Sequence, residues 1–104
     1  MAWILLSLAG LLEIVWAFSM KQSHGFTRLA PSIVTIVTMC ASFALLSLSM
    51  KSLPLGTAYT IWTGIGAVGA FLIGLIILGE PASGMRIIAA LLIVSGLVLM
   101  KLAS

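Results

Sequence analysis

The sequence predicts an all-α membrane protein with four transmembrane helices. Of the 104 residues, 62% are hydrophobic and 7% are charged, and the mean hydropathy is +1.34. A water-soluble domain carries about 25% charged residues, so this chain is too poor in charge to cover a surface that faces water. In addition, four apolar segments each approach the roughly 20 residues that a helix needs to cross a bilayer.

Short connectors rich in turn residues separate the four segments. Inside lipid, backbone polar groups must be satisfied within the segment, so each segment is predicted to be a helix. The helices are expected over about residues 2–20, 31–50, 57–78 and 85–100, within one transmembrane domain of residues 1–104. The first segment has no basic leader region and carries an acid, so it is expected to stay as a helix and not to be a cleaved signal peptide.

The basic residues are scattered singly near the segment ends, so the net charge of +3 does not indicate nucleic-acid binding. With four spans, Lys51 and Lys101 lie on the side of both termini, and Lys21, Arg28 and Arg86 lie on the other side. Orientation depends on an excess of Lys and Arg on one side. The chain therefore has almost no orientation bias, and insertion in both directions is compatible with it.

Glu13 lies near the centre of the first segment, AWILLSLAGLLEIVWAFSM. An acid at a helix centre costs about 2.5–3.5 kcal/mol on insertion scales. No basic residue lies at mid-membrane to pair with it, so we expect a functional acid whose positive partner is a proton or a cationic substrate. Intramembrane charges face a bundle interior or a wet cavity. Because four short helices are too thin to enclose one, a homodimer with two Glu13 side chains near a shared axis is predicted.

Helical spacing indicates which residues share a face. The face of Glu13 holds the small residues Ala9, Gly10 and Ala17, together with Trp16 and Met20. The second segment has a stripe of hydroxyls, namely Ser32, Thr35, Thr38, Ser42 and Ser49. Such hydroxyls commonly bond back to carbonyls of their own helix, which we expect for most of the stripe. Ser42, near mid-span, is the best candidate for holding an acidic side chain or a substrate N–H.

The last two segments differ in character. One face of the third segment holds Tyr59, Trp62, Thr63, Gly66 and Ala70. The two aromatic residues either belong to the interfacial belt or line a site, and the glycines at 64, 66, 69 and 74 allow close packing or a bend. The fourth segment has no acid and no aromatic residue. Its small aliphatic face is predicted to dimerise through Ala89, Leu92, Ile93 and Gly96.

The sequence does not predict catalysis. His24 is expected to be a loop residue, Glu80 to be solvated, and Cys40 to be a small buried residue with no intrachain disulfide partner. His24 and Cys40 lie on different segments, and there is no nucleophile–base pair or metal cluster to suggest. We therefore expect no enzyme activity, no metal and no cofactor.

The stretches LAGLLEIVWA, HGFTRLAPS and SLPLGTAYTIWTGIGAVGA, together with the four-span length, resemble the small multidrug resistance family of proton-coupled exporters. The similarity covers nearly the whole chain. Trp16 stands where the quaternary-ammonium exporters of that family usually carry Gly. With Gly10, Met39 and Lys101, it resembles the guanidinium-exporter subtype.

The resemblance implies an antiparallel homodimer of multi-pass subunits in the bacterial inner membrane. It implies alternating-access export of guanidinium and small substituted guanidinium ions, with protons competing with substrate for Glu13 of both subunits. By the same resemblance, Trp16 and Ser42 hydrogen-bond Glu13, and Tyr59 and Trp62 line the site. The resemblance further implies that the third helix bends at Gly64 and Gly66 and that the fourth helix dimerises. Thr60 departs from the Ala of many relatives, which bears on substrate range.

The chemistry agrees with these implications, because guanidinium is planar and offers a fork of N–H donors that matches a carboxylate. The aromatic rings supply faces for a flat cation. The closest alternative is a broader exporter of quaternary ammonium and lipophilic cations, against which Trp16 argues because it fills space. Alternatives from other classes are a proton or cation channel, and a structural subunit in which Glu13 only holds helices together.

Overall fold

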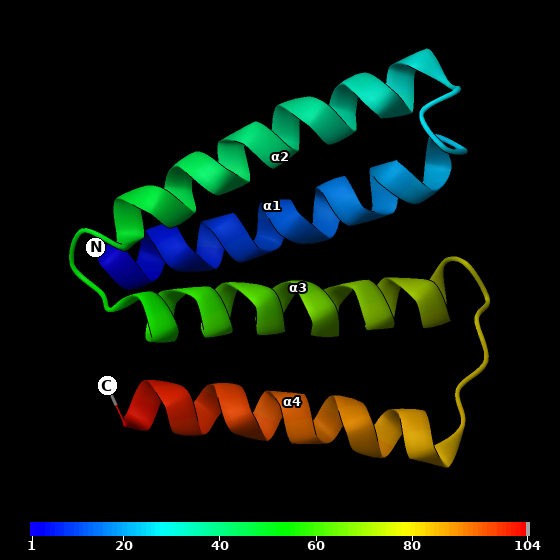
Figure 1. Cartoon of the computed structure of the whole chain (residues 1–104). Helices are drawn as coiled ribbons and strands as arrows, with labels where there is room; N and C mark the ends of the chain where they lie inside the picture. Colours follow the sequence, from blue (N-terminus) through cyan, green and yellow to red (C-terminus); the bar gives the residue numbers. More distant parts are fainter. Residues whose placement is uncertain (104) are drawn as a thin grey trace.

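The computed structural model describes residues 1–103 and consists of four helices side by side in one layer (Figure 1). The helices are α1 (Ala2–Gln22), α2 (Leu29–Ser49), α3 (Leu55–Ile76) and α4 (Gly84–Leu102). Each is long and apolar enough to cross a membrane. The predicted class is therefore confirmed, and the helix bounds differ from those predicted by no more than two residues at either end.

Prolines explain where two helices begin earlier than predicted. Pro31 lies in the first turn of α2, and Pro54 immediately precedes α3. The first N–H groups of a helix have no partner within the helix, so a residue without an N–H is tolerated there. Ser83 caps α4, where its hydroxyl accepts a hydrogen bond from the N–H of Arg86 at 3.2 Å.

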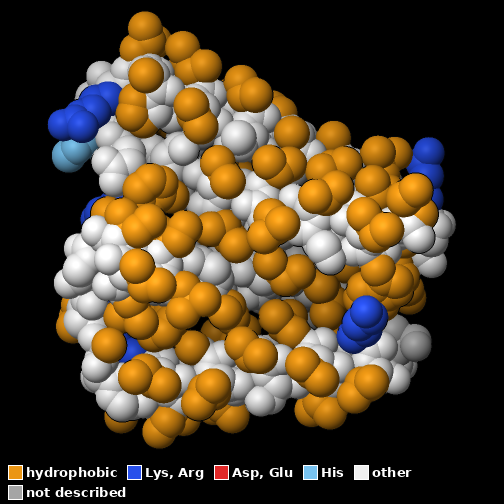
Figure 2. All heavy atoms as spheres, turned by 180° about the vertical axis from the view of Figure 1, so that it is seen from behind, with side chains coloured by type: hydrophobic (Ala, Val, Ile, Leu, Met, Phe, Trp, Pro, Cys, Tyr) orange, Lys and Arg blue, Asp and Glu red, His pale blue; other side chains and the backbone are white. Residues whose placement is uncertain are grey.

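The order of the helices across the layer is α2, α1, α3, α4 (Figure 1). The layer measures 40 × 34 × 16 Å, so it is about one helix thick. The core lies where α1, α2 and α3 meet and consists of Leu6, Ala9, Leu46, Ala58, Ile61 and Trp62. By contrast, α4 packs against α3 and has no buried residue. Figure 2 shows apolar side chains over most of the rear face, with Lys and Arg near its edges.

The termini and connectors lie at the two ends of the layer as four antiparallel spans require. The N-terminus, the connector between α2 and α3, and the end of α4 lie at one end (Figure 1). The other two connectors lie at the opposite end. The first of these is a tight turn in which His24, Gly25 and Phe26 all have positive φ. The Ser23 hydroxyl closes the turn by donating to the Met20 carbonyl at 2.7 Å and accepting from the Phe26 N–H at 3.0 Å.

Glycines bring α1 and α3 close together. A Cβ added to Gly10 would lie 2.6 Å from Cγ2 of Ile65, and one added to Gly69 would collide with Ile14. Gly64 gives the same close approach to Leu97 of α4. These contacts support the close-packing interpretation of the glycines. A bend at Gly64 and Gly66 stays a prediction, since α3 runs as one helix from Leu55 to Ile76.

One residue lies on the opposite side from that expected. Cys40 is exposed on α2, whereas we expected it to be buried. Its face of α2 points away from α1 and carries other exposed apolar side chains, among them Ile36 and Val37. In a helix that is apolar all round, composition does not indicate which side meets the neighbouring helix, and the prediction was wrong for that reason.

Candidate functional site

Glu13 lies on α1 where this helix meets α3. Its carboxyl group occupies the space left by the missing side chain of Gly66, where an added Cβ would collide with Oε1 of Glu13. This Oε1 is buried and has no hydrogen-bond partner among the described residues. The structure thus gives Gly66 a use that we did not expect from the sequence, which is to make room for the acid.

Trp16 lies one turn further along α1, and its Nε1 is likewise buried without a hydrogen-bond partner within residues 1–103. A buried polar atom left unsatisfied costs about 1–3 kcal/mol. Here an unpaired acceptor on Glu13 and an unpaired donor on Trp16 lie three positions apart on one helix face. Unsatisfied groups of this kind are exceptions in a native structure and point to a site that takes up a further group.

Ser42 links three helices. Its hydroxyl is fully buried, donates to the backbone carbonyl of Ala9 at 2.6 Å and accepts from Nε1 of Trp62 at 3.0 Å. In this arrangement its proton is directed to α1 backbone and not to Glu13, so a bond from Ser42 to Glu13 stays a prediction. The rest of the stripe bonds back to the carbonyls of α2 or of its N-cap Arg28, as expected. The hydroxyls of Ser32, Thr35, Thr38 and Ser49 donate to the carbonyls of Arg28, Pro31, Val34 and Leu46.

Replacing Ser42 with Ala is expected to lower the free energy of unfolding by about 1–3 kcal/mol, because the buried N–H of Trp62 would lose its acceptor. The control is Ser95→Ala on α4, where the hydroxyl is exposed and donates to the Leu91 carbonyl of its own helix. That change is expected to stay within about 0.5 kcal/mol. Thermal unfolding in detergent measures both. An equal loss in the two variants would show that the Ser42 link does not hold the helices together.

Four aromatic rings form a continuous row beside this link. The ring centroids of Trp16 and Phe43 are 6.4 Å apart, and those of Phe43 and Trp62 are 5.6 Å apart, both edge to face. The Tyr59 ring lies 5.6 Å from that of Trp62. Sequence reasoning missed Phe43, because a phenylalanine in an apolar segment carries no signal of its own. Its position next to Ser42 was the available clue.

The other predicted residues lie at varying distances from this centre. Met39 is half-buried one turn before Ser42 on α2. Thr60 is exposed and lines, with Tyr59, a groove of about 510 Å³ between α3 and α4. Glu13 is not part of that groove, so the single chain does not bring Thr60 to the carboxylate. On α4, Ile93 and Gly96 line the groove, while Ala89 and Leu92 are exposed outside it.

Lys101, near the end of α4, lies over the ring of Trp3 with its Nζ 5.2 Å from the ring centroid. This contact ties the end of α4 to the start of α1 at the edge of the layer, where the long side chain of Lys101 reaches toward the polar interface. Because it lies against Trp3 near the interface, Lys101 is outside the candidate site around Glu13.

An acid inside a membrane-spanning bundle marks a substrate or ion path, so the four spans and the unpaired Glu13 define a membrane transporter. The chain belongs to the small multidrug resistance family. Residues 1–93 match the family described as Small Multidrug Resistance protein. This confirms the family resemblance seen in the sequence and places the chain among transporters, not enzymes.

Relatives of known name match from end to end. A protein named guanidinium exporter from Yersinia pseudotuberculosis is 59% identical, with 100% of both chains covered. The guanidinium exporters of Salmonella typhimurium and Escherichia coli are 58% and 55% identical, and each match covers 100% of this chain and 99% of the relative.

Proposed function

We propose that this protein is a guanidinium exporter that exchanges guanidinium for protons by alternating access. The observation that carries the proposal is the full-length identity of 55–59% to proteins of that name. The unpaired carboxyl oxygen of Glu13 supports it independently, because a buried acceptor without a fixed cation is suited to a mobile one.

Several features of the site suit a guanidinium ion. The ion is planar and donates N–H bonds in a fork that matches a carboxylate such as Glu13. The row of Trp16, Phe43, Trp62 and Tyr59 offers aromatic rings to a flat cation. The unpaired N–H of Trp16 adds a buried donor one turn along α1 from Glu13. We assign Ser42 the supporting role of fixing Trp62 and the α1 backbone.

Coupling of proton entry to guanidinium exit follows if both ions bind the same acid, Glu13. A proton and a guanidinium ion both neutralise Glu13, and they exclude each other there. If the protein changes its facing only when Glu13 is neutralised, each guanidinium ion that leaves is exchanged for protons that enter. A bend of α3 at Gly64 and Gly66 supplies the movement in this scheme, and no cofactor is needed beyond the coupling protons.

The substrate class is tested by transport currents in proteoliposomes that contain the wild-type protein. Guanidinium is expected to give a saturable current, and tetrapropylammonium is expected to give little, because Trp16 occupies space that a bulky cation needs. Currents of similar size for the two ions would instead favour the alternative, a broad exporter of quaternary ammonium and lipophilic cations.

We further propose that the working unit is an antiparallel homodimer in the bacterial inner membrane, with a Glu13 from each subunit in one shared site. The single chain is a layer about one helix thick, too thin to surround a substrate. Its α4 has no buried residue and exposes Ala89, Leu92 and Gly96, where small residues permit close helix contact. The near balance of Lys and Arg between the two ends supports insertion in both orientations.

Cysteine labelling tests the antiparallel arrangement. Cys40 is first replaced by Ser, which leaves the chain free of cysteine, and a single cysteine is then placed at Ala2 or Ala103. Each terminus is expected to be labelled from both sides of the membrane, because the two subunits point in opposite directions. One uniform orientation in membranes with active transport would refute the arrangement.

A further inference from the structure

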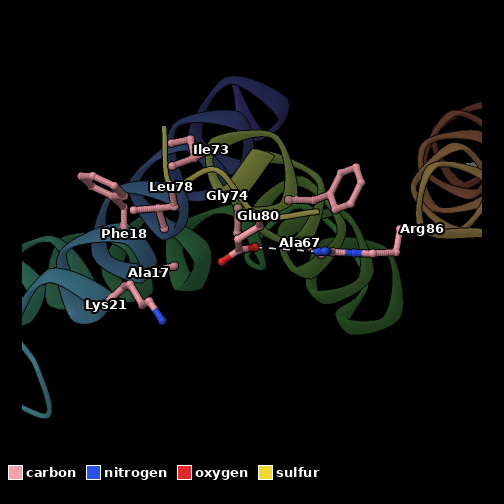
Figure 3. Close-up of a pocket in the computed structure, with 11 residues that line it drawn as sticks. Ala17, Phe18, Lys21, Ala67, Ile73, Gly74, Leu78, Glu80 and Arg86 are labelled. Atoms are coloured by element: carbon pink, nitrogen blue, oxygen red, sulfur yellow. Dashed lines mark ion pairs between the residues drawn. The ribbon is translucent and has the colours of Figure 1, made fainter. Parts of the chain in front are cut away.

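The chain has two acidic residues, and the second one already binds a guanidinium group. Oε1 of Glu80 lies 3.7 Å from Nη2 of Arg86. The same arginine donates from Nη1 to the Pro81 carbonyl at 2.6 Å, and its Cζ lies 5.2 Å from the ring centroid of Phe71. Figure 3 shows the ion pair, with Arg86 reaching toward Glu80 from α4. A carboxylate, a carbonyl and an aromatic face are the groups that a free guanidinium ion would also use.

Glu80, Arg86 and Phe71 line a cavity of about 340 Å³ that also contacts α1. On α1 the cavity is lined by Ala17, one turn beyond Glu13. On α3 it is lined by Ala70, one turn beyond Gly66, and then by Gly74 near Glu80. The cavity therefore extends from Ala17, one helical turn beyond Glu13 on α1, to the connector between α3 and α4, and Glu13 itself does not line it. Ala17, Ala70 and Gly74 leave room on the α1 and α3 sides of this cavity.

The charges around the cavity make any cation site there weak. Lys21 and Arg86 both line the cavity, and Glu80 is the acidic side chain that opposes them. The side chains of Arg86 and Glu80 are 39% and 41% exposed, so their ion pair is partly screened by solvent. The guanidinium group of Arg86 now fills this weak site. A weak site suits a short stay of an ion during transport and not tight binding.

We propose that Glu80, the Pro81 carbonyl and Phe71 form an outer guanidinium subsite, which Arg86 fills while no substrate is there. A guanidinium ion that moves between Glu13 and this end of the protein displaces the Arg86 side chain. This proposal rests on the proposed function, since it takes the same ion as substrate.

The test uses the full-length Glu13→Gln variant in detergent, in which Glu80 is the remaining acidic side chain. The carboxyl carbon of glutamate is labelled with ¹³C, and its NMR signal is followed during titration with guanidinium chloride. Tetramethylammonium chloride is the matched control, because it has the same charge and no N–H donor. Guanidinium is expected to shift the Glu80 signal in a saturable way, and tetramethylammonium only to the small extent that screening causes.

Removing the tethered competitor gives the sharper prediction. Arg86→Ala in the same background is expected to tighten guanidinium binding by about 1.5- to 5-fold, the factor by which an exposed ion pair of this kind competes. Equal shifts with both salts, or an unchanged guanidinium affinity in Arg86→Ala, would overturn the proposal.

Wild-type transport measured in parallel separates the two proposals. Guanidinium transport without a saturable Glu80 shift refutes the outer subsite and leaves the proposed function intact. A saturable shift without transport supports the subsite and refutes the proposed function.

Discussion

Replacing Glu13 with Gln is expected to reduce guanidinium transport driven by a pH gradient by about 10- to 100-fold. The amide keeps the shape of the side chain and still fits against Gly66. It cannot carry the negative charge, and hydrogen bonds to charged groups are worth about 1.5–3 kcal/mol, where each 1.4 kcal/mol is a factor of ten. It also cannot bind and release a proton at physiological pH. Uptake of labelled guanidinium into proteoliposomes measures the effect.

Glu13→Asp is the matched control, because it keeps the carboxylate and shortens the side chain by one methylene group. It is expected to retain pH-driven exchange at a reduced rate. Thermal unfolding of both variants checks that each still folds. Undiminished transport by the Gln variant would remove Glu13 from its proposed role. Equal loss in the Asp and Gln variants would mean that the length of the side chain is as critical as its charge.

The second large effect is expected for Gly66→Ala. A methyl group there would collide with the carboxyl group of Glu13 and push it from its place between α1 and α3. Overpacking of this kind costs typically about 1–3 kcal/mol, partly offset by the better helix propensity of Ala. We expect a lower unfolding temperature together with strongly weakened guanidinium binding, measured by thermal unfolding and by isothermal calorimetry.

Gly56→Ala is the control within the same helix. An added Cβ at Gly56 meets nothing within 4 Å. The same chemical change is therefore expected to leave guanidinium binding unchanged and to keep or slightly raise stability, by up to about 1 kcal/mol. If Gly66→Ala binds guanidinium as well as Gly56→Ala does, the close contact between Gly66 and Glu13 has no part in the site.

The sequence was sufficient to predict the helices because crossing a bilayer constrains length and polarity together. The errors at the helix starts have a specific cause: we placed the starts at Pro31 and beyond Pro54, although a helix accepts proline in its first turn. Glu13 could also be predicted, because an unpaired acid in mid-membrane is costly enough to need an explanation.

The neighbours of Glu13 were harder to predict, because the order of the helices across the layer could not be inferred from the sequence. Only when α1 lies between α2 and α3 does Ser42 reach the Ala9 carbonyl, and only then does Gly66 meet Glu13. Phe43 was missed for the same reason. The pairing of Glu80 with Arg86 was also missed, since we expected Glu80 to be solvated. Glu80 lies in the connector and Arg86 in the first turn of α4, and the connector folds back so that the two charges meet.

The same limit applies to the proposed dimer. In a single chain α4 packs against α3 but has no buried residue, and the rear face of the layer presents mostly apolar side chains (Figure 2). An intramembrane acid is found facing a bundle interior or a wet cavity. A second copy supplies what the one-helix-thick layer lacks, and an inverted copy is consistent with the balance of basic residues. In that arrangement each Glu13 is half of one site.

Coupling between the two ions is the central claim, and it is tested most directly by reversing the driving force. Proteoliposomes containing the wild-type protein are loaded with guanidinium and a pH-sensitive dye, with equal pH inside and outside, and are then diluted into buffer without guanidinium. Exit of guanidinium is expected to drive protons inward and acidify the interior, and the Glu13→Gln variant is expected to give no such change. Guanidinium exit from the wild-type protein with no proton movement would contradict the account and would favour a channel.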